Sequence, residues 1–209
     1  YTVVGTVEFL VKDPDFFFLE MNPRLQVEHG ITEEITRTDL VEIQIRIARG
    51  EKLASLKPLD HGVCIEARVN AEDPDQGFLP APGRIALFDP ALGPRVRIDT
   101  GVAMGSTVPA AFDSMVAKVM AFGDTRDEAR ARLVSALRDF DLVIERGATN
   151  KSYLIQLLES EPYRRGGVDT RWLDRWNEER DKQAPHAVEG LVLAAILSYR
   201  AQWGAERRN

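Results

Sequence analysis

The chain has 209 residues, of which 44% are hydrophobic and 29% are charged, so it can bury a sizeable core as one large domain or as one domain with an appendage. A net charge of −6 and an isoelectric point near 5.2 leave no excess of lysine and arginine to neutralise phosphates, which argues against nucleic-acid binding. No apolar run reaches the roughly 18 to 20 residues of a membrane span, and a single cysteine excludes an intrachain disulfide. We therefore expect a soluble protein of the cytoplasm, or of the mitochondrial matrix if the source is eukaryotic.

The first predicted elements are two strands, residues 3–11 and 16–22, separated by a turn that contains Asp13 and Pro14. The first residue, Tyr1, already lies inside this strand-like run. We therefore expect the sequence to be a piece of a longer protein.

The remaining pattern mixes helices and strands and predicts an α+β fold. A capping box at Asp39, followed by apolar residues at helical spacing, predicts a helix that ends at Gly50. Residues 63–71 alternate between apolar and polar side chains, which predicts a strand with one polar face. A second capping box at Thr125 begins another helix. Further strands are expected at 84–88, 95–99 and 114–122, and further helices at 150–160, 170–182 and 186–203, the last of them amphipathic.

Two acids in the first hairpin indicate a cation site. If the hairpin is symmetric about Pro14, Glu8 lies directly opposite Glu20 across the two strands. Like charges in this position are destabilising, and a bound Mg²⁺ or Mn²⁺ would remove the conflict because these ions take carboxylate oxygens. Asn22, two residues further along the same face, could add a carbonyl oxygen. The alternative is an edge hairpin with two solvated glutamates.

The polar alternation continues beyond the second strand. With a period of two, Asn22, Arg24, Gln26 and Glu28 project to one side of the chain. An arginine fork beside a carboxylate suits a small planar oxyanion, because the guanidinium can bind it bidentately and the carboxylate can take its proton. The alternative is a surface ion pair between Arg24 and Glu28, which would contribute little to stability.

Six motifs, taken together and in order, resemble the C-terminal portion of biotin carboxylases, which are ATP-grasp enzymes. The resemblance covers about residues 3 to 175. Each motif is a moderate signal alone, whereas six in order are a strong one. The motifs are GTVEFL, FLEMNPRLQVEH, EARVNAEDP, GFLPAPGRI, FDSM (residues 112–115) and RGATN (residues 146–150).

The resemblance implies the reaction and its cofactors. Members of this family use ATP and bicarbonate to make carboxyphosphate and then carboxylate biotin that is attached to a carrier domain or protein. By resemblance, Glu8 and Glu20, assisted by Asn22, bind the Mg²⁺ or Mn²⁺ ions that bridge the ATP phosphates.

The resemblance also implies roles for the residues that follow the hairpin. Arg24, Gln26 and the backbone amide of Val27 would hold bicarbonate, and Glu28 would be the general base that deprotonates it. Arg68, in the strand of residues 63–71, would stabilise the negative charge that develops on the ureido oxygen of biotin. An ion pair between Arg68 and Glu66 is the plain structural alternative.

The resemblance further implies two regions and several partners. Residues 1–57 would end the ATP-grasp domain, and residues 58–175 would form the biotin carboxylase C-terminal subdomain with an antiparallel sheet. Residues 176–209 lie beyond the matched region, and their apolar pattern predicts a helical extension. We expect an acyl-CoA carboxylase, working with a biotin carrier domain, a carboxyltransferase component and a second copy of itself in a homodimer or a larger complex.

The sequence also departs from the family. It contains no glycine-rich loop and no lysine in a nucleotide-binding context, so we expect the 209 residues alone to be inactive. Gly30 replaces a more frequent proline, which would loosen the segment behind the base. Two alternatives remain: an ATP-grasp ligase with another substrate, and a non-catalytic module for folding or dimerisation.

Overall fold

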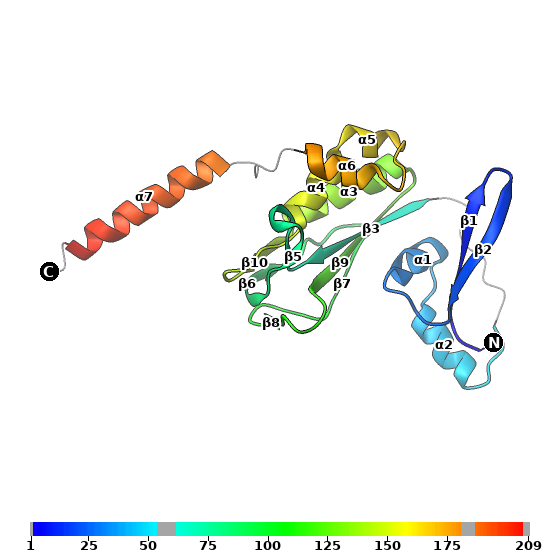
Figure 1. Ribbon diagram of the computed structural model, residues 1–209. Helices are drawn as coiled ribbons and strands as arrows, with labels where there is room; N and C mark the ends of the chain where they lie inside the picture. The colour runs from blue at the N-terminus through cyan, green and yellow to red at the C-terminus, as the bar shows by residue number, and fades with distance from the viewer. Residues whose placement is uncertain (1, 54–61, 181–186, 207–209) are drawn as a thin grey trace. The chain divides into compact units, whose positions relative to one another are not determined.

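The computed structural model describes residues 2–53, 62–180 and 187–206 (Figure 1). The chain divides into two compact units, residues 1–165 and 166–209. Its helices and antiparallel strands confirm the predicted α+β class. The predicted boundary between residues 57 and 58 lies outside the described residues and stays a prediction. All residues predicted for the site belong to the first unit.

The chain opens with an antiparallel hairpin formed by β1 (Thr6–Lys12) and β2 (Asp15–Asn22). Glu8 faces Glu20 directly, as the sequence predicts. The symmetry on which that prediction relied is only partly correct, because a bulge after Glu8 shifts the register so that Lys12 pairs with Asp15. The turn is therefore shorter than expected.

Both faces of this hairpin are exposed along most of its length, although the strands are rich in apolar side chains. Apolar residues on either face expose 40–77% of their surface, with Val11 the most exposed. Edge-to-face contacts of Phe9 with Phe16 and Phe18 are the aromatic contacts within the hairpin. A two-stranded sheet of this kind has little stability of its own.

A three-stranded antiparallel sheet forms the centre of the first unit. Its order is β3 (Val63–Asn70), β9 (Met115–Gly123) and β7 (Val96–Thr100), so β9 is the middle strand and is buried from Val116 to Gly123. One face packs against α3 (Arg126–Asp139), whose N-cap Thr125 accepts a hydrogen bond from the backbone N–H of Glu128 at 3.2 Å. The core between them contains Ala67, Val69, Val119, Leu133, Leu137 and Phe140.

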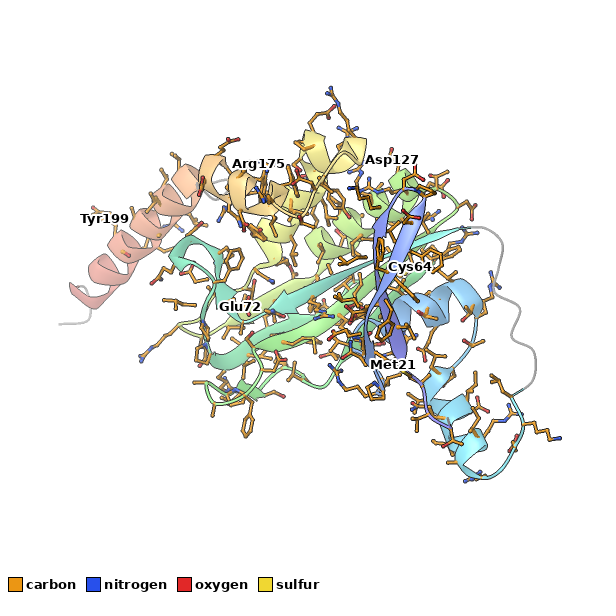
Figure 2. All side chains as sticks on the ribbon, turned by 45° about the vertical axis from the view of Figure 1, so that its right-hand side comes forward. Met21, Cys64, Glu72, Asp127, Arg175 and Tyr199 are labelled. Carbon is orange, nitrogen blue, oxygen red and sulfur yellow. The ribbon has the colours of Figure 1, made fainter. Side chains whose placement is uncertain are left out.

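The opposite face of this sheet packs against α1 (His29–Thr36), a helix that the sequence pattern did not predict. Ile31 and Ile35 of α1 contact a small core that contains Cys64, which Figure 2 labels on β3. The predicted polar face of β3 is therefore only partly polar. Burial raises the pKa of the Cys64 thiol to about 12, so this cysteine is a structural apolar residue.

The other elements of the first unit surround this sheet. Helix α2 (Leu40–Ala48) begins as predicted, because the Asp39 carboxylate accepts a hydrogen bond from the backbone N–H of Glu42 at 2.7 Å. Strand β6 (Gly83–Asp89), which the sequence predicts, forms a second sheet with β8 (Thr107–Val108) and β10 (Asp141–Ile144), which it did not predict. The remaining elements are β4 (Glu72–Asp73), a 3-10 turn (Pro74–Gln76), β5 (Leu79–Pro80), α4 (Lys151–Glu159) and α5 (Glu161–Arg165).

The second unit contains α6 (Trp172–Glu179) and α7 (Ala187–Glu206). The apolar residues of α7 are spread around the helix instead of forming one stripe, so the prediction of an amphipathic helix was wrong. Leu191 and Ile196 both remain exposed, as does Tyr199, which Figure 2 labels. Within the parts of the chain that are described, no helix combines the length and apolar character needed to cross a bilayer.

Gly30 allows α1 to approach the sheet closely. A Cβ atom at this position would lie 2.4 Å from Sδ of Met120, which is fully buried on β9. The absence of a side chain at residue 30 therefore allows close packing of α1 on β9. The expectation that Gly30 loosens the segment did not take this packing into account.

We expect Gly30→Ala to destabilise the protein by up to about 2 kcal/mol. Overpacking a core costs roughly 1–3 kcal/mol, and the better helix propensity of alanine returns only about 1 kcal/mol. Urea unfolding would measure the change. Gly101→Ala is the control because a Cβ at Gly101 meets nothing within 4 Å. Equal stability of the two variants would contradict the packing argument.

Candidate active site

The hairpin brings the three predicted metal ligands together. The side-chain amide of Asn22 donates to Glu8 Oε1 at 2.8 Å and to Glu20 Oε1 at 3.3 Å, so both carboxylates lie on one face. Among the described residues, no three His, Cys, Asp or Glu side chains gather as a metal site. Two carboxylates and one amide nevertheless fit Mg²⁺ or Mn²⁺, because such ions usually share their remaining positions with water and substrate phosphates.

The segment after β2 does not continue as an extended strand, so the predicted alternation of Arg24, Gln26 and Glu28 on one side was wrong. The chain bends at once, since the Arg24 N–H donates to the Asn22 carbonyl at 2.9 Å. It then enters a turn in which the His29 N–H donates to the Gln26 carbonyl at 3.3 Å, and α1 begins. Arg24 is exposed, and its guanidinium donates to the Leu25 carbonyl at 3.3 Å.

Glu28 and Arg68 meet at the end of this loop. Nη2 of Arg68 donates to Oε2 of Glu28 at 2.7 Å, although the two residues are 40 positions apart in the sequence. The two side chains remain 47% and 50% exposed, so a small substrate can reach both. The geometry thus joins a carboxylate able to accept a proton with a fixed cation.

Glu66 supports Arg68 from the same strand. Its Oε1 accepts a hydrogen bond from Nε of Arg68 at 3.5 Å, and its side chain is only 4% exposed. Burial raises the pKa of the Glu66 carboxyl, while Lys118 and Arg68 oppose that rise. The predicted alternative, an ion pair between Arg68 and Glu66, therefore exists together with the contact to Glu28 and does not replace it.

Asn150 anchors the backbone of the strand that carries Arg68. Its side-chain amide donates to the Arg68 carbonyl at 3.0 Å and accepts from the backbone N–H of Asn70 at 2.9 Å. Asn150 is buried and directly precedes α4. The sequence analysis included Asn150 in the RGATN motif without giving it a role. A polar amide at the end of a motif and directly before a helix was the feature that could have indicated one.

Lys118 is a second residue near the site that sequence reasoning missed. It is buried in the middle of β9, where its direct cross-strand neighbours are Arg68 on β3 and Asp99 on β7. Its ammonium group donates to the Val27 carbonyl at 2.8 Å. A lysine within the otherwise apolar run of residues 115–123 was the available signal, because lysine is rarely buried without partners.

Two family models match the chain. Residues 66–175 match the biotin carboxylase C-terminal domain, and residues 1–56 match the ATP-binding domain of the carbamoyl-phosphate synthase L chain. The second match covers the loop with Glu28, and the first covers Arg68 and Asn150. The contact between Glu28 and Arg68 thus joins two regions that different models recognise.

Curated relatives agree with the first match. Biotin carboxylase 1 of Bacillus subtilis is 43% identical over 182 residues, which are 85% of this chain and 40% of that protein. The biotin-dependent acyl-coenzyme A carboxylase alpha3 subunit of Mycobacterium leprae is 45% identical over 185 residues, which are 85% of this chain and 30% of that protein. The chain spans less than half the length of each of these relatives.

Solved structures give the same result. The biotin carboxylase domain of Hydrogenobacter thermophilus 2-oxoglutarate carboxylase, a dimer in complex with MgADP, ADP and bicarbonate, superposes with a TM-score of 0.79 at 34% identity, covering 86% of this chain and 40% of that one. Biotin carboxylase of Campylobacter jejuni gives 0.77 at 38% identity, covering 84% and 39%. These chains favour biotin carboxylase over an ATP-grasp ligase of another kind. The chain described here belongs to the biotin carboxylase family.

Proposed function

We propose that these 209 residues supply part of the active site of a biotin carboxylase, which uses ATP and bicarbonate to carboxylate biotin on a carrier. The observation that carries the proposal is the 2.7 Å contact between Arg68 and Glu28. It puts a proton acceptor and a cation side by side in an accessible place. A related domain has been solved with bicarbonate and MgADP, which supports the choice of substrates.

In this proposal the loop before α1 performs the first step. Arg24, Gln26 and the backbone amide of Val27 hold bicarbonate, and Glu28 takes its proton. An oxygen of the deprotonated bicarbonate then attacks the γ-phosphorus of ATP, so that carboxyphosphate forms and ADP leaves. The half-exposed carboxylate of Glu28 can reach such a substrate without a rearrangement of the core.

Arg68 acts in the second step. In this step the ureido nitrogen of biotin loses its proton and bonds to the carboxyl carbon of carboxyphosphate, while the C–O bond to phosphate breaks and the released phosphate takes up the proton. Negative charge develops on the ureido oxygen as the nitrogen is deprotonated, and a guanidinium held in place stabilises it. Glu66 and Glu28 keep the guanidinium in position from two sides. The Arg68 side chain therefore needs little reorganisation when biotin binds.

Glu8, Glu20 and Asn22 would hold Mg²⁺ or Mn²⁺ near the loop. A bound ion neutralises charge on the ATP phosphates. Asn22 now donates its amide N–H₂ to both carboxylates, so metal binding requires its carbonyl oxygen to face the ion. The three side chains need no change in strand register for this.

We further propose the setting of this chemistry. The activity belongs to a longer polypeptide, since the chain spans less than half of its relatives, and the isolated 209 residues are inactive. An acyl-CoA carboxylase is the proposed parent, with a biotin carrier, a carboxyltransferase component and a homodimeric or larger assembly in the cytoplasm. Its relatives include an acyl-coenzyme A carboxylase subunit and a domain solved as a dimer, which support this setting.

The test is ATP cleavage by the full-length polypeptide that contains these residues. ADP release should require bicarbonate and should rise when free biotin or a biotinylated carrier is added. Replacing biotin with an amine or a carboxylic acid should leave ADP release at background. ATP cleavage that needs neither bicarbonate nor biotin would overturn the proposed function.

A further inference from the structure

The buried ammonium of Lys118 is held between two partners on different segments. Its side chain is 9% exposed, and an unpaired cation at such a depth would be very costly. It lies 3.2 Å from Asp99 Oδ2 and 2.8 Å from the Val27 carbonyl oxygen. Lys118 therefore connects the middle strand of the sheet to the loop before α1.

The Val27 carbonyl connects Lys118 to Glu28, the proposed general base. That carbonyl belongs to the same planar peptide group as the N–H and the Cα atom of Glu28. Fixing the oxygen therefore also restricts the position of the Cα atom that carries the Glu28 side chain. Arg68, the cross-strand neighbour of Lys118, holds the other end of the same residue through its carboxylate. Adjacent positions of one sheet thus hold Glu28 by its backbone and by its side chain.

The anion beside Lys118 is itself held in place. Arg97 donates from Nε to Asp99 Oδ1 at 2.8 Å and from Nη2 to Oδ2 at 3.0 Å, and its Nη1 donates to buried Glu33 on α1 at 2.7 Å. Burial alone would raise the pKa of Asp99, but hydrogen bonds from Arg97 and Lys118 outweigh it and lower that pKa. Asp99 therefore stays charged, and the position of Lys118 is well determined.

We propose that Lys118 is a positioning residue for Glu28: it fixes the Val27–Glu28 peptide and so holds the general base in place. The proposal rests on the proposed function, because it assigns Lys118 a part in that same site. Lys118 contacts no substrate. Its removal lets the loop move and misplaces the base.

A second lysine provides a matched control. Nζ of Lys151 donates to the Phe140 carbonyl at 2.6 Å, so it also joins a partly buried ammonium to a backbone oxygen. That contact lies at the start of α4 and does not involve the loop before α1. If Lys118 is merely structural, Lys118→Met and Lys151→Met will behave alike.

The experiment compares these variants in the full-length polypeptide. We expect Lys118→Met to lower kcat for bicarbonate-dependent ATP cleavage by about 10- to 100-fold, since a misplacement of about 1 Å can cost that much. The KM for ATP should change less than kcat, because the described contacts of Lys118 are with Val27 and Asp99 and include no metal ligand. Lys151→Met should leave kcat within about twofold of the wild type. Equal losses in the two variants would overturn the proposal.

Hydrogen exchange gives a readout that does not depend on turnover. Mass spectrometry of the same proteins should show faster exchange in the peptide that spans residues 22–31 of Lys118→Met, but not of Lys151→Met. Unchanged exchange in that peptide would also overturn the proposal. If the wild type lacks bicarbonate-dependent cleavage, the proposed function fails, while the exchange result still decides whether Lys118 holds the loop.

If Lys118→Met does not fold, Asp99→Asn replaces it. This variant keeps an oxygen acceptor for Lys118 and removes only the charge that fixes its position. We expect a smaller fall in kcat, about 3- to 10-fold, with faster exchange in the same peptide. Wild-type values for both measurements would refute the positioning role.

Discussion

Glu28→Gln in the full-length polypeptide should lower the rate of bicarbonate-dependent ATP cleavage by about 10²- to 10⁴-fold, because the substitution removes the general base but preserves its shape. That loss corresponds to about 2.7–5.4 kcal/mol at the transition state. The ion pair with Arg68 is about half exposed, and such pairs contribute only about 0–1 kcal/mol to folding. Activity should therefore collapse while the free energy of unfolding barely changes.

Glu145→Gln is the matched control for this prediction. Glu145 is 50% exposed and accepts from Nη1 of Arg84 at 2.9 Å, so its pair is similar to that of Glu28 in distance and exposure. Initial rates of ADP release and urea unfolding should be measured on both variants. If the two variants keep the same turnover, Glu28 is only the partner of a surface ion pair, and the catalytic assignment is wrong.

Asn150→Leu should reduce the free energy of unfolding by about 2–6 kcal/mol. The substitution removes the Asn150 side-chain amide and so leaves the Arg68 carbonyl and the Asn70 N–H without this partner; each unsatisfied buried group costs about 1–3 kcal/mol. A typical domain has only about 5–15 kcal/mol of stability. Urea unfolding followed by circular dichroism would measure the loss.

The control for Asn150 is Gln76→Leu, which also replaces an amide with leucine. The Gln76 amide makes one exposed hydrogen bond, to Asp73 Oδ2 at 2.7 Å, so its loss should change stability by less than about 0.5 kcal/mol. If Asn150→Leu reduces the free energy of unfolding as little as Gln76→Leu does, water must hydrogen-bond to the Arg68 carbonyl and the Asn70 N–H in its place. The role of Asn150 as an anchor of the Arg68 strand would then be wrong.

Local patterns predicted the parts of the fold that depend on neighbouring residues. The caps at Asp39 and Thr125 lie where the sequence indicates, and the pairing of Glu8 with Glu20 follows from a nearby turn. The bulge after Glu8 left no sequence signal, since it depends on how the two strands twist. Short-range chemistry therefore determined these elements to within a few residues.

The loop before α1 could not be predicted in the same way. Residues 22–28 alternate like a strand, yet the chain turns there because α1 packs its apolar residues on Met120 and Cys64 of the sheet. That packing joins segments far apart in the sequence, and so does the contact of Glu28 with Arg68. Family resemblance indicated Glu28 and Arg68 as site residues. Their contact with each other, and the contact of Lys118 with the loop, became visible only in the three-dimensional structure.

The exposed apolar hairpin has a practical consequence for work with the isolated polypeptide. Phe17 and Phe18, which alternate between the two faces of β2, are 58% and 65% exposed, and the outer edges of β1 and β2 pair with no further strand of the described residues. Such a surface favours nonspecific self-association at the concentrations used for sedimentation or light scattering. Oligomers seen with the 209 residues alone would then report adhesion through the hairpin, so quaternary structure should be measured on the full-length polypeptide.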